Sequence, residues 1–175
     1  MKHLSIFTVG LLLSGQIHGQ NSLFVPFGLS KHDVISFLNT RDYIRKIEED
    51  ADMQSLRAEL DENKRVEYVF TEQGLYATTV TRSYEQRRTA REVEKSVMAY
   101  MNTVSQGQVQ QSHTEEGIVC YTAMADSRVL KLFIQTHEES VTLTLTAMSR
   151  NMGPIADLKD FYYEADLLQR RFISN

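Results

Sequence analysis

The sequence predicts an α+β fold in which an antiparallel sheet is covered on one face by helices, in the order α-β-β-(β)-α-β-β-β-α. Three observations carry this prediction. Apolar residues recur at three- and four-residue steps over 83–107, as on an amphipathic helix. Apolar and polar residues alternate over 65–83 and over 140–149, as on strands with one buried face. Short polar or glycine-containing stretches separate these segments.

Residues 1–19 have the pattern of a secretory signal peptide. Lys2 precedes an apolar run over 4–13, and small and polar residues follow it. The run is shorter than the roughly 20 apolar residues that cross a bilayer. We expect cleavage near Gly19, export to a periplasm or the exterior, and one α+β domain over 20–175 without a transmembrane segment.

The stretch that begins at Ser30 predicts the start of a helix rather than a catalytic site. Ser30 stands three residues before Asp33, which is close to the spacing of a capping box. Apolar residues follow at helical spacing. We therefore assign the Ser30 hydroxyl to capping and Asp33 to the positive end of the helix dipole, and expect the helix to end over 39–41.

Residues 42–62 fit two periods. Met53, Leu56 and Leu60 have the spacing of a helix, whereas Leu56, Ala58 and Leu60 also alternate like a strand. The polar stretch over 61–64 favours a strand pair, in which 53–60 runs into the next segment.

Residues 65–83 predict a hairpin. β-branched and aromatic residues alternate on both sides of a turn over 72–74 that contains a glycine.

Residues 83–107 form the clearest predicted helix. Ser83 and Gln86 repeat the capping-box spacing, and Gly107 is a natural stop. The apolar stripe of this helix comprises Ala90, Val93, Val97, Tyr100, Met101 and Val104.

Three strands are predicted next, over 117–125, 128–136 and 140–149. A final helix is predicted from Gly153-Pro154, because proline suits the first helical position. The alternation is clearest in the last strand, where four aliphatic side chains face one way and three threonines the other: Val141, Leu143, Leu145 and Ala147 against Thr142, Thr144 and Thr146.

This order loosely duplicates a unit of a helix followed by paired strands, although the sequence identity between the halves is too thin to define a repeat. Over most of the mature chain the element order resembles two architectures. One is the tandem helix–hairpin module of small secreted inhibitor and envelope-assembly proteins. The other is the fold of type III secretion chaperones, which are small acidic dimers. Neither resemblance assigns a functional residue.

Charge and motif content disfavour several chemistries. The formal net charge of −4 and the lack of a basic run argue against nucleic-acid binding. Cys120 stands between apolar neighbours and is expected to be buried. No metal-ligand spacing, glycine-rich phosphate loop or nucleophile elbow is present, so we assign no catalytic residue, metal or cofactor.

Tyrosines are the candidate interface residues, because their side chains suit protein contacts. Tyr76 and Tyr84 are expected to point away from the core. Tyr162 and Tyr163 lie on different faces of the last predicted helix, so one of them is expected to be exposed. Four methionines are instead expected to fill core gaps: Met98, Met101, Met124 and Met148.

The favoured function is a non-catalytic, exported binding module, monomeric or homodimeric, that holds a protein or a component of the cell envelope. Two alternatives stay open. One is a small secreted hydrolase with a site of Asp and Glu side chains, and the other is a ligand-carrying cup of sheet and helices.

Overall fold

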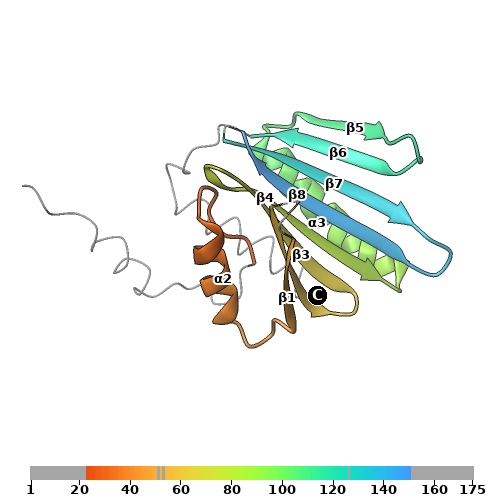
Figure 1. The fold of residues 1–175 in the computed structure, drawn as a ribbon. Helices are drawn as coiled ribbons and strands as arrows, with labels where there is room; N and C mark the ends of the chain where they lie inside the picture. Colours follow the sequence, from red (N-terminus) through yellow and green to blue (C-terminus); the bar gives the residue numbers. More distant parts are fainter. Residues whose placement is uncertain (1–22, 51, 53, 126, 151–175) are drawn as a thin grey trace, which may run out of the picture.

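The computed structural model describes residues 23–50, 52, 54–125 and 127–150. Within them, eight strands form one antiparallel sheet in the spatial order β1-β2-β3-β4-β8-β7-β6-β5. Two helices, α2 and α3, accompany the sheet in these residues (Figure 1).

The first half of the chain is a helix followed by a four-stranded meander. Each strand pairs antiparallel with the next one along the chain. The elements are α2 (Lys31–Asn39), β1 (Lys46–Asp50), β2 (Ser55–Asp61), β3 (Lys64–Thr71) and β4 (Gly74–Tyr84).

The second half repeats this arrangement. Its strands again form an antiparallel meander. The elements are α3 (Arg87–Val104), β5 (Val109–His113), β6 (Val119–Met124), β7 (Arg128–Thr136) and β8 (Val141–Ser149).

The last strands of the two meanders join the halves. β4 and β8 pair antiparallel, with Val80 opposite Leu145 and Thr81 opposite Thr144. The strand order therefore reads outward from this seam as 4-3-2-1 on one side and 8-7-6-5 on the other. The strand order of the sheet is therefore symmetric about the β4–β8 seam.

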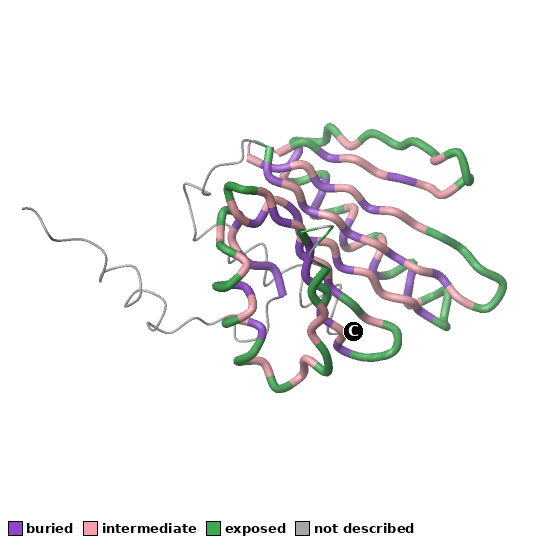
Figure 2. Tube along the Cα trace, in the orientation of Figure 1, coloured by how far each residue is buried: buried purple, intermediate pink, exposed green. Residues whose placement is uncertain are grey.

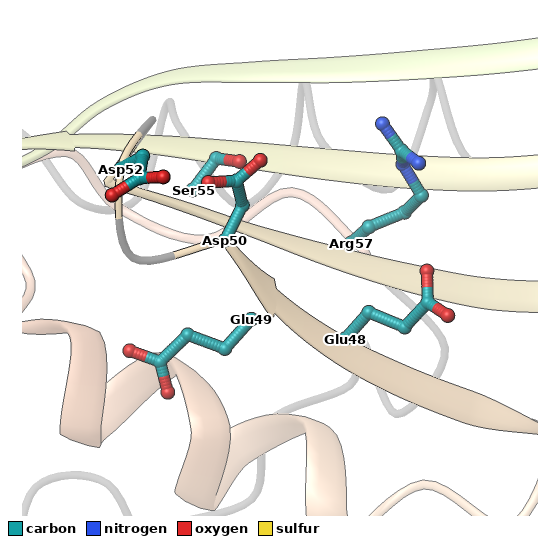
Figure 3. A pocket seen from close by; sticks show the side chains of 6 residues that line it. All are labelled: Glu48, Glu49, Asp50, Asp52, Ser55 and Arg57. Carbon is teal, nitrogen blue, oxygen red and sulfur yellow. The ribbon is translucent and has the colours of Figure 1, made fainter.

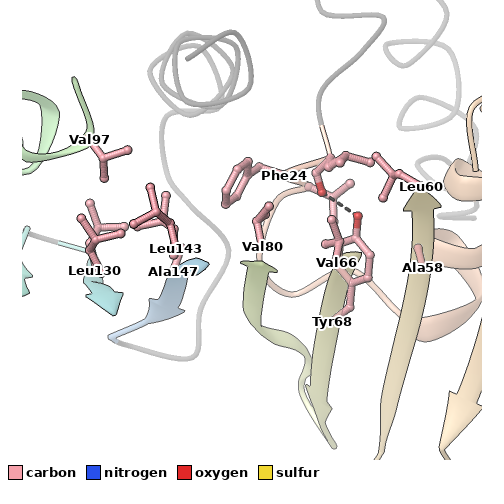
Figure 4. Packing of buried hydrophobic residues seen from close by; sticks show 14 of the residues in the cluster. Phe24, Ala58, Leu60, Val66, Tyr68, Val80, Val97, Leu130, Leu143 and Ala147 are labelled. Carbon is pink, nitrogen blue, oxygen red and sulfur yellow. Dashed lines mark hydrogen bonds between the residues drawn. The ribbon is translucent and has the colours of Figure 1, made fainter. Parts of the chain in front are cut away.

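The hydrophobic core lies on one face of the sheet. α3 packs against β4, β8 and β6, and Figure 4 shows Val97 of this helix close to Leu130, Leu143 and Ala147. The predicted stripe of α3 is confirmed, since its first five members are buried and Val104 packs against the core. Figure 2 shows the resulting alternation of buried and half-buried residues along β7 and β8.

The segment before α2 completes the core over the first meander. Leu23 and Phe24 are buried. The Tyr68 hydroxyl on β3 donates a hydrogen bond of 2.6 Å to the Leu23 carbonyl (Figure 4). The N–H of Gly28 donates to the Leu75 carbonyl at 2.9 Å, which holds the same segment against the start of β4.

The capping box at Ser30 is confirmed. The Ser30 hydroxyl accepts from the Asp33 N–H at 3.2 Å, and the Asp33 carboxylate accepts from the Ser30 N–H at 3.3 Å. α2 ends at Asn39, within the expected range. Both side chains that could have suggested a catalytic pair are therefore occupied in starting the helix.

The predicted three-helix α+β layout is wrong. The described residues form mainly an eight-stranded antiparallel sheet with two short helices. Each half supplies four strands where the prediction had two or three, and the two resemblances that rested on that layout fall with it. The helix expected from Gly153-Pro154 lies outside the described residues.

Two local predictions are also corrected. β5 was not expected, because only Val109 among its residues is apolar. Ser83 does not cap α3, since it is still in β4, where its N–H donates to the Asn63 carbonyl at 2.9 Å. α3 begins after Gln86, whose side chain makes no capping hydrogen bond.

The remaining strand predictions are confirmed. The strand predicted over 53–60 corresponds to β2, and the hairpin predicted over 65–83 corresponds to β3 and β4. The three strands after α3 match β6, β7 and β8 closely. The antiparallel sheet is thus the part of the prediction that the structure supports.

Candidate functional site

The face of the sheet opposite the helices, here called the open face, is the main candidate. In β8 the threonines point to this face while Leu143 and Leu145 point into the core. Because the strands are in register, each open-face residue can be followed from strand to strand by its pairing partner. The side chains fall into three rows that run across the sheet.

The first row, here called the apolar row, crosses five strands. Val69 pairs with Ala77, Ala77 with Met148, Met148 with Val129, and Val129 with Met124. Met124 is the large hydrophobic side chain that stands out among the described residues, with 55% of its surface exposed. Ala77 is buried, and Val69, Val129 and Met148 are half-buried, so the row is most accessible at Met124. An apolar line on the face of a sheet that the helices do not cover suits a contact surface.

The second and third rows are polar at the seam. Hydroxyl pairs bridge β4 and β8 in these rows, Thr79 with Thr146 at 3.0 Å and Thr81 with Thr144 at 3.3 Å. A third pair lies beyond the rows, at the end of β4, and joins Ser83 to Thr142 at 2.9 Å. These hydroxyls satisfy one another across the strands, as cross-strand threonine pairs do. The threonine row of the last predicted strand is thus one side of a hydroxyl ladder that joins the two halves.

On the first meander the polar rows become charged. One row continues through Glu67, Arg57 and Glu48, and Arg57 lies 3.7 Å from the Glu67 carboxylate. The other continues through Arg65, Glu59 and Lys46. Charges of opposite sign alternate in both rows, so they neutralise one another rather than form a field of one sign.

On the second meander the same rows contain mostly uncharged groups. Lys131 follows Thr146, and Phe133 follows Thr144. Cys120 pairs with Phe133 and is buried, which confirms the expected burial of this thiol. It lies among open-face residues, however, since its sulfur is 3.9 Å from the Thr122 hydroxyl two residues along.

A shallow acidic hollow lies at the β1–β2 edge. Its lining contains four carboxylates, one hydroxyl and one guanidinium: Glu48, Glu49, Asp50, Asp52, Ser55 and Arg57 (Figure 3). It is the arrangement closest to the carboxylate site expected of a hydrolase.

Lysine side chains engage two of the carboxylates that line this hollow. A glycosidase site needs one carboxyl group whose pKa is raised, so that it can act as an acid. Here the hydrogen bond from Lys46, together with its charge, lowers the pKa of Glu48. Glu49 reaches toward α2, as Figure 3 shows, and its carboxylate lies 2.7 Å from Lys31. Both groups are occupied in ion pairs, one within β1 and one between β1 and α2.

The four tyrosines predicted as interface residues differ in their burial and in whether the structure describes them. Tyr76 is half-buried beside the strand irregularity at the end of the apolar row. Tyr84 is buried in the core under the Arg82 guanidinium, 4.8 Å from its ring centre, so the expectation that it points away from the core is wrong. Tyr162 and Tyr163 lie outside the described residues.

The methionine predictions are partly wrong. Met101 is buried and Met98 packs against the core, as expected. Met124 and Met148 instead belong to the open face. The sequence contained a signal for Met148, because it continues the even-numbered threonine series of β8.

No group of three His, Cys, Asp or Glu side chains is placed to hold a metal ion within the part of the chain that the structure describes. None of the helices described there is both long and apolar enough to span a membrane.

Comparison with known proteins gave no relatives. No protein-family model matches the chain, and no match was found among curated proteins or solved structures.

Proposed function

We propose that the protein is an exported, non-catalytic binding module that holds a protein partner on the open face of its sheet. The single observation that carries this proposal is the apolar row from Val69 to Met124. It crosses five strands on the side of the sheet opposite the helices and ends at the exposed Met124.

The chemistry of this face suits a protein more than a small molecule. The apolar row can supply the buried centre of an interface, and the hydroxyl ladder beside it supplies hydrogen-bonding groups for the rim. Met124 and Met148 have flexible, polarizable side chains that adapt to an uneven surface. A small ligand would need a concave, largely apolar site, whereas this face is a sheet surface.

Export is part of the same proposal. The charged start and short apolar run of residues 1–19 support it. N-terminal sequencing of the secreted fraction tests it, with Gln20 expected as the first residue. Recovery of the chain with Met1 intact would contradict export by this route.

Site-specific photo-crosslinking tests the binding face. A benzoyl-phenylalanine placed at Met124 is expected to give one defined adduct in the host cell, whose protein component is identified by mass spectrometry. The matched control carries the same probe at Arg91, an exposed position on α3.

Binding of the purified partner then completes the test. Met124→Asp places a charge in the apolar row and is expected to weaken binding at least tenfold, whereas Arg91→Asp leaves binding unchanged. Equal adducts from both positions, or full affinity in the Met124→Asp protein, would show that the partner binds elsewhere.

A further inference from the structure

The two edges of the sheet differ in charge. The β1 edge carries Lys46, Glu48, Glu49 and Asp50 within five residues. Charged side chains of this kind are a common protection of an edge strand against pairing with another chain. Strand β5, at the opposite edge, reads Val-Gln-Gln-Ser-His and contains neither a carboxylate, a lysine or arginine, nor a proline.

The outer side of β5 is accessible. Four of its five residues are exposed, and Val109 is half-buried. In the described sheet β5 pairs only with β6, and Figure 1 shows it as the outermost strand. An uncharged, accessible edge presents a row of backbone donors and acceptors to a further strand.

The register with β6 fixes which backbone groups point outward. The Thr114 N–H donates to the Ile118 carbonyl at 2.9 Å, so this pair is hydrogen-bonded. Hydrogen-bonded and non-hydrogen-bonded pairs alternate along an antiparallel ladder. Ser112 and Gln110 therefore bond to β6, and the N–H and C=O groups of Val109, Gln111 and His113 face away from the sheet.

We propose that β5 pairs antiparallel with β5 of a second copy of this chain, about a twofold axis at Gln111. A strand can pair with itself around a residue whose backbone groups face outward, and Gln111 is the middle one of three such residues. In this register Gln111 exchanges both hydrogen bonds with the second copy's Gln111. Val109 does the same with the second copy's His113.

The side chains of β5 favour pairing with a second copy of the same strand. Gln111 lies opposite the second copy's Gln111, Val109 opposite its His113, and Gln110 opposite its Ser112. The pairing therefore brings no like charges together. The same operation on β1 would place Glu48 opposite a second Glu48, which repels. A twofold contact of one surface with itself is the commonest form of association between identical chains.

The pairing would join the two open faces. Gln110 and Ser112 end the two polar rows of the open face. An axis perpendicular to the sheet keeps both open faces on the same side, so the rows continue from one copy into the other. The inference rests on the β5 edge alone and stands whether or not the open face binds a partner.

Charge substitutions at Gln111 test the proposal, because this position faces itself across the axis. Light scattering of the unmodified protein is expected to give twice the mass of one chain at tens of micromolar. Gln111→Glu and Gln111→Lys should each raise the dimer dissociation constant at least tenfold through like-charge repulsion. An equimolar mixture of the two variants should form dimers again, since opposite charges then meet.

The controls separate this contact from others. Gln111→Thr keeps the backbone donor and stays dimeric, and circular dichroism of each variant verifies that it is folded. A monomeric unmodified protein would overturn the proposal, as would a dimer that both charged variants retain. A monomer that instead binds an extended peptide along β5 would also overturn it and would show strand capture.

Discussion

Tyr68 is the residue at which burial and hydrogen bonding act together most strongly. Its side chain is fully buried under the first meander, and its hydroxyl donates to the Leu23 carbonyl at 2.6 Å. Burial, with a smaller contribution from Tyr43, raises the pKa of the Tyr68 hydroxyl well above its usual range. The hydroxyl is thus held as a neutral donor that fixes the N-terminal segment to β3.

Tyr68→Phe is expected to lower the free energy of unfolding by about 1 kcal/mol at pH 7, because one buried hydrogen bond is lost. The raised pKa also predicts a pH effect. The unfolded chain ionises at the ordinary value of 10.0 while the folded chain keeps its proton, so stability is full below pH 10 and falls above it. Urea unfolding at pH 7 and at about pH 11 measures both effects.

The variant should lose stability less steeply above pH 10 than the unmodified protein. The stability of the variant still falls somewhat with pH in this range, because burial also raises the pKa of Tyr43, Tyr84 and Tyr100. If Tyr68→Phe changed neither the fall of stability above pH 10 nor the stability at pH 7, the role assigned to Tyr68 would be wrong.

Gly74 tests the contact between the N-terminal segment and the β3–β4 turn. Its φ is +107°, and a Cβ at this position would lie 2.5 Å from the Gly28 carbonyl oxygen. Gly74→Ala is therefore expected to cost about 3 kcal/mol, from both backbone strain and a clash with main chain. Thermal melts would measure this loss.

Gly117→Ala is the matched control. Gly117 has a φ of +79° but no atom within 4 Å of the Cβ position. Strain alone should then cost about 1–2 kcal/mol. Equal losses at the two glycines would show that the segment does not pack against the turn as described.

Residue-scale prediction from sequence depended on neighbours along the chain. The burial of Cys120 was predictable from its apolar flanks. The burial of Tyr84 was not, because the ring is covered by Arg82 and by core residues distant in sequence. The exposure of Met124 was likewise hidden, since Met124 ends its strand and its face is set by pairing with Val129.

At the scale of elements, the two helices begin in different ways. α2 has a complete capping box at Ser30, whereas Gln86 before α3 makes no side-chain capping bond. α3 is instead stabilised by its buried stripe and by an exposed Arg88–Glu92 pair of 3.2 Å, which contributes only a few tenths of a kcal/mol.

Ser30→Ala is accordingly expected to lower stability by about 1 kcal/mol, the usual cost of losing an N-cap. Gln86→Ala removes no capping bond and should change stability by less than half that amount. Chemical denaturation of both variants provides the comparison. A larger loss at Gln86 than at Ser30 would contradict the assignment of the caps.

Elements with a clear period were predictable and the others were not. β8 and the stripe of α3 follow from spacing alone. β5 contains one apolar residue, and its strand conformation depends on pairing with β6. The false cap at Ser83 arose because capping-box spacing was present, while pairing with Thr142 kept this residue in β4.

At the scale of the molecule, the sheet is larger and more symmetric than the sequence indicates. The duplication of helix and strands was visible, but not that each unit holds four strands or that β4 and β8 form the seam. The open face could not be assembled from sequence, because its rows join residues of five to eight strands through long-range register.

Methionine methyl NMR measures directly whether the partner binds the open face. Met124 and Met148 lie on the open face, while Met98 and Met101 lie on α3 beneath the opposite face. On titration with the partner that cross-linking identifies, we expect shifted or broadened signals for Met124 and Met148 and unchanged signals for Met98 and Met101. The reverse pattern would place the partner on the helical side of the sheet and would rule out binding at the open face.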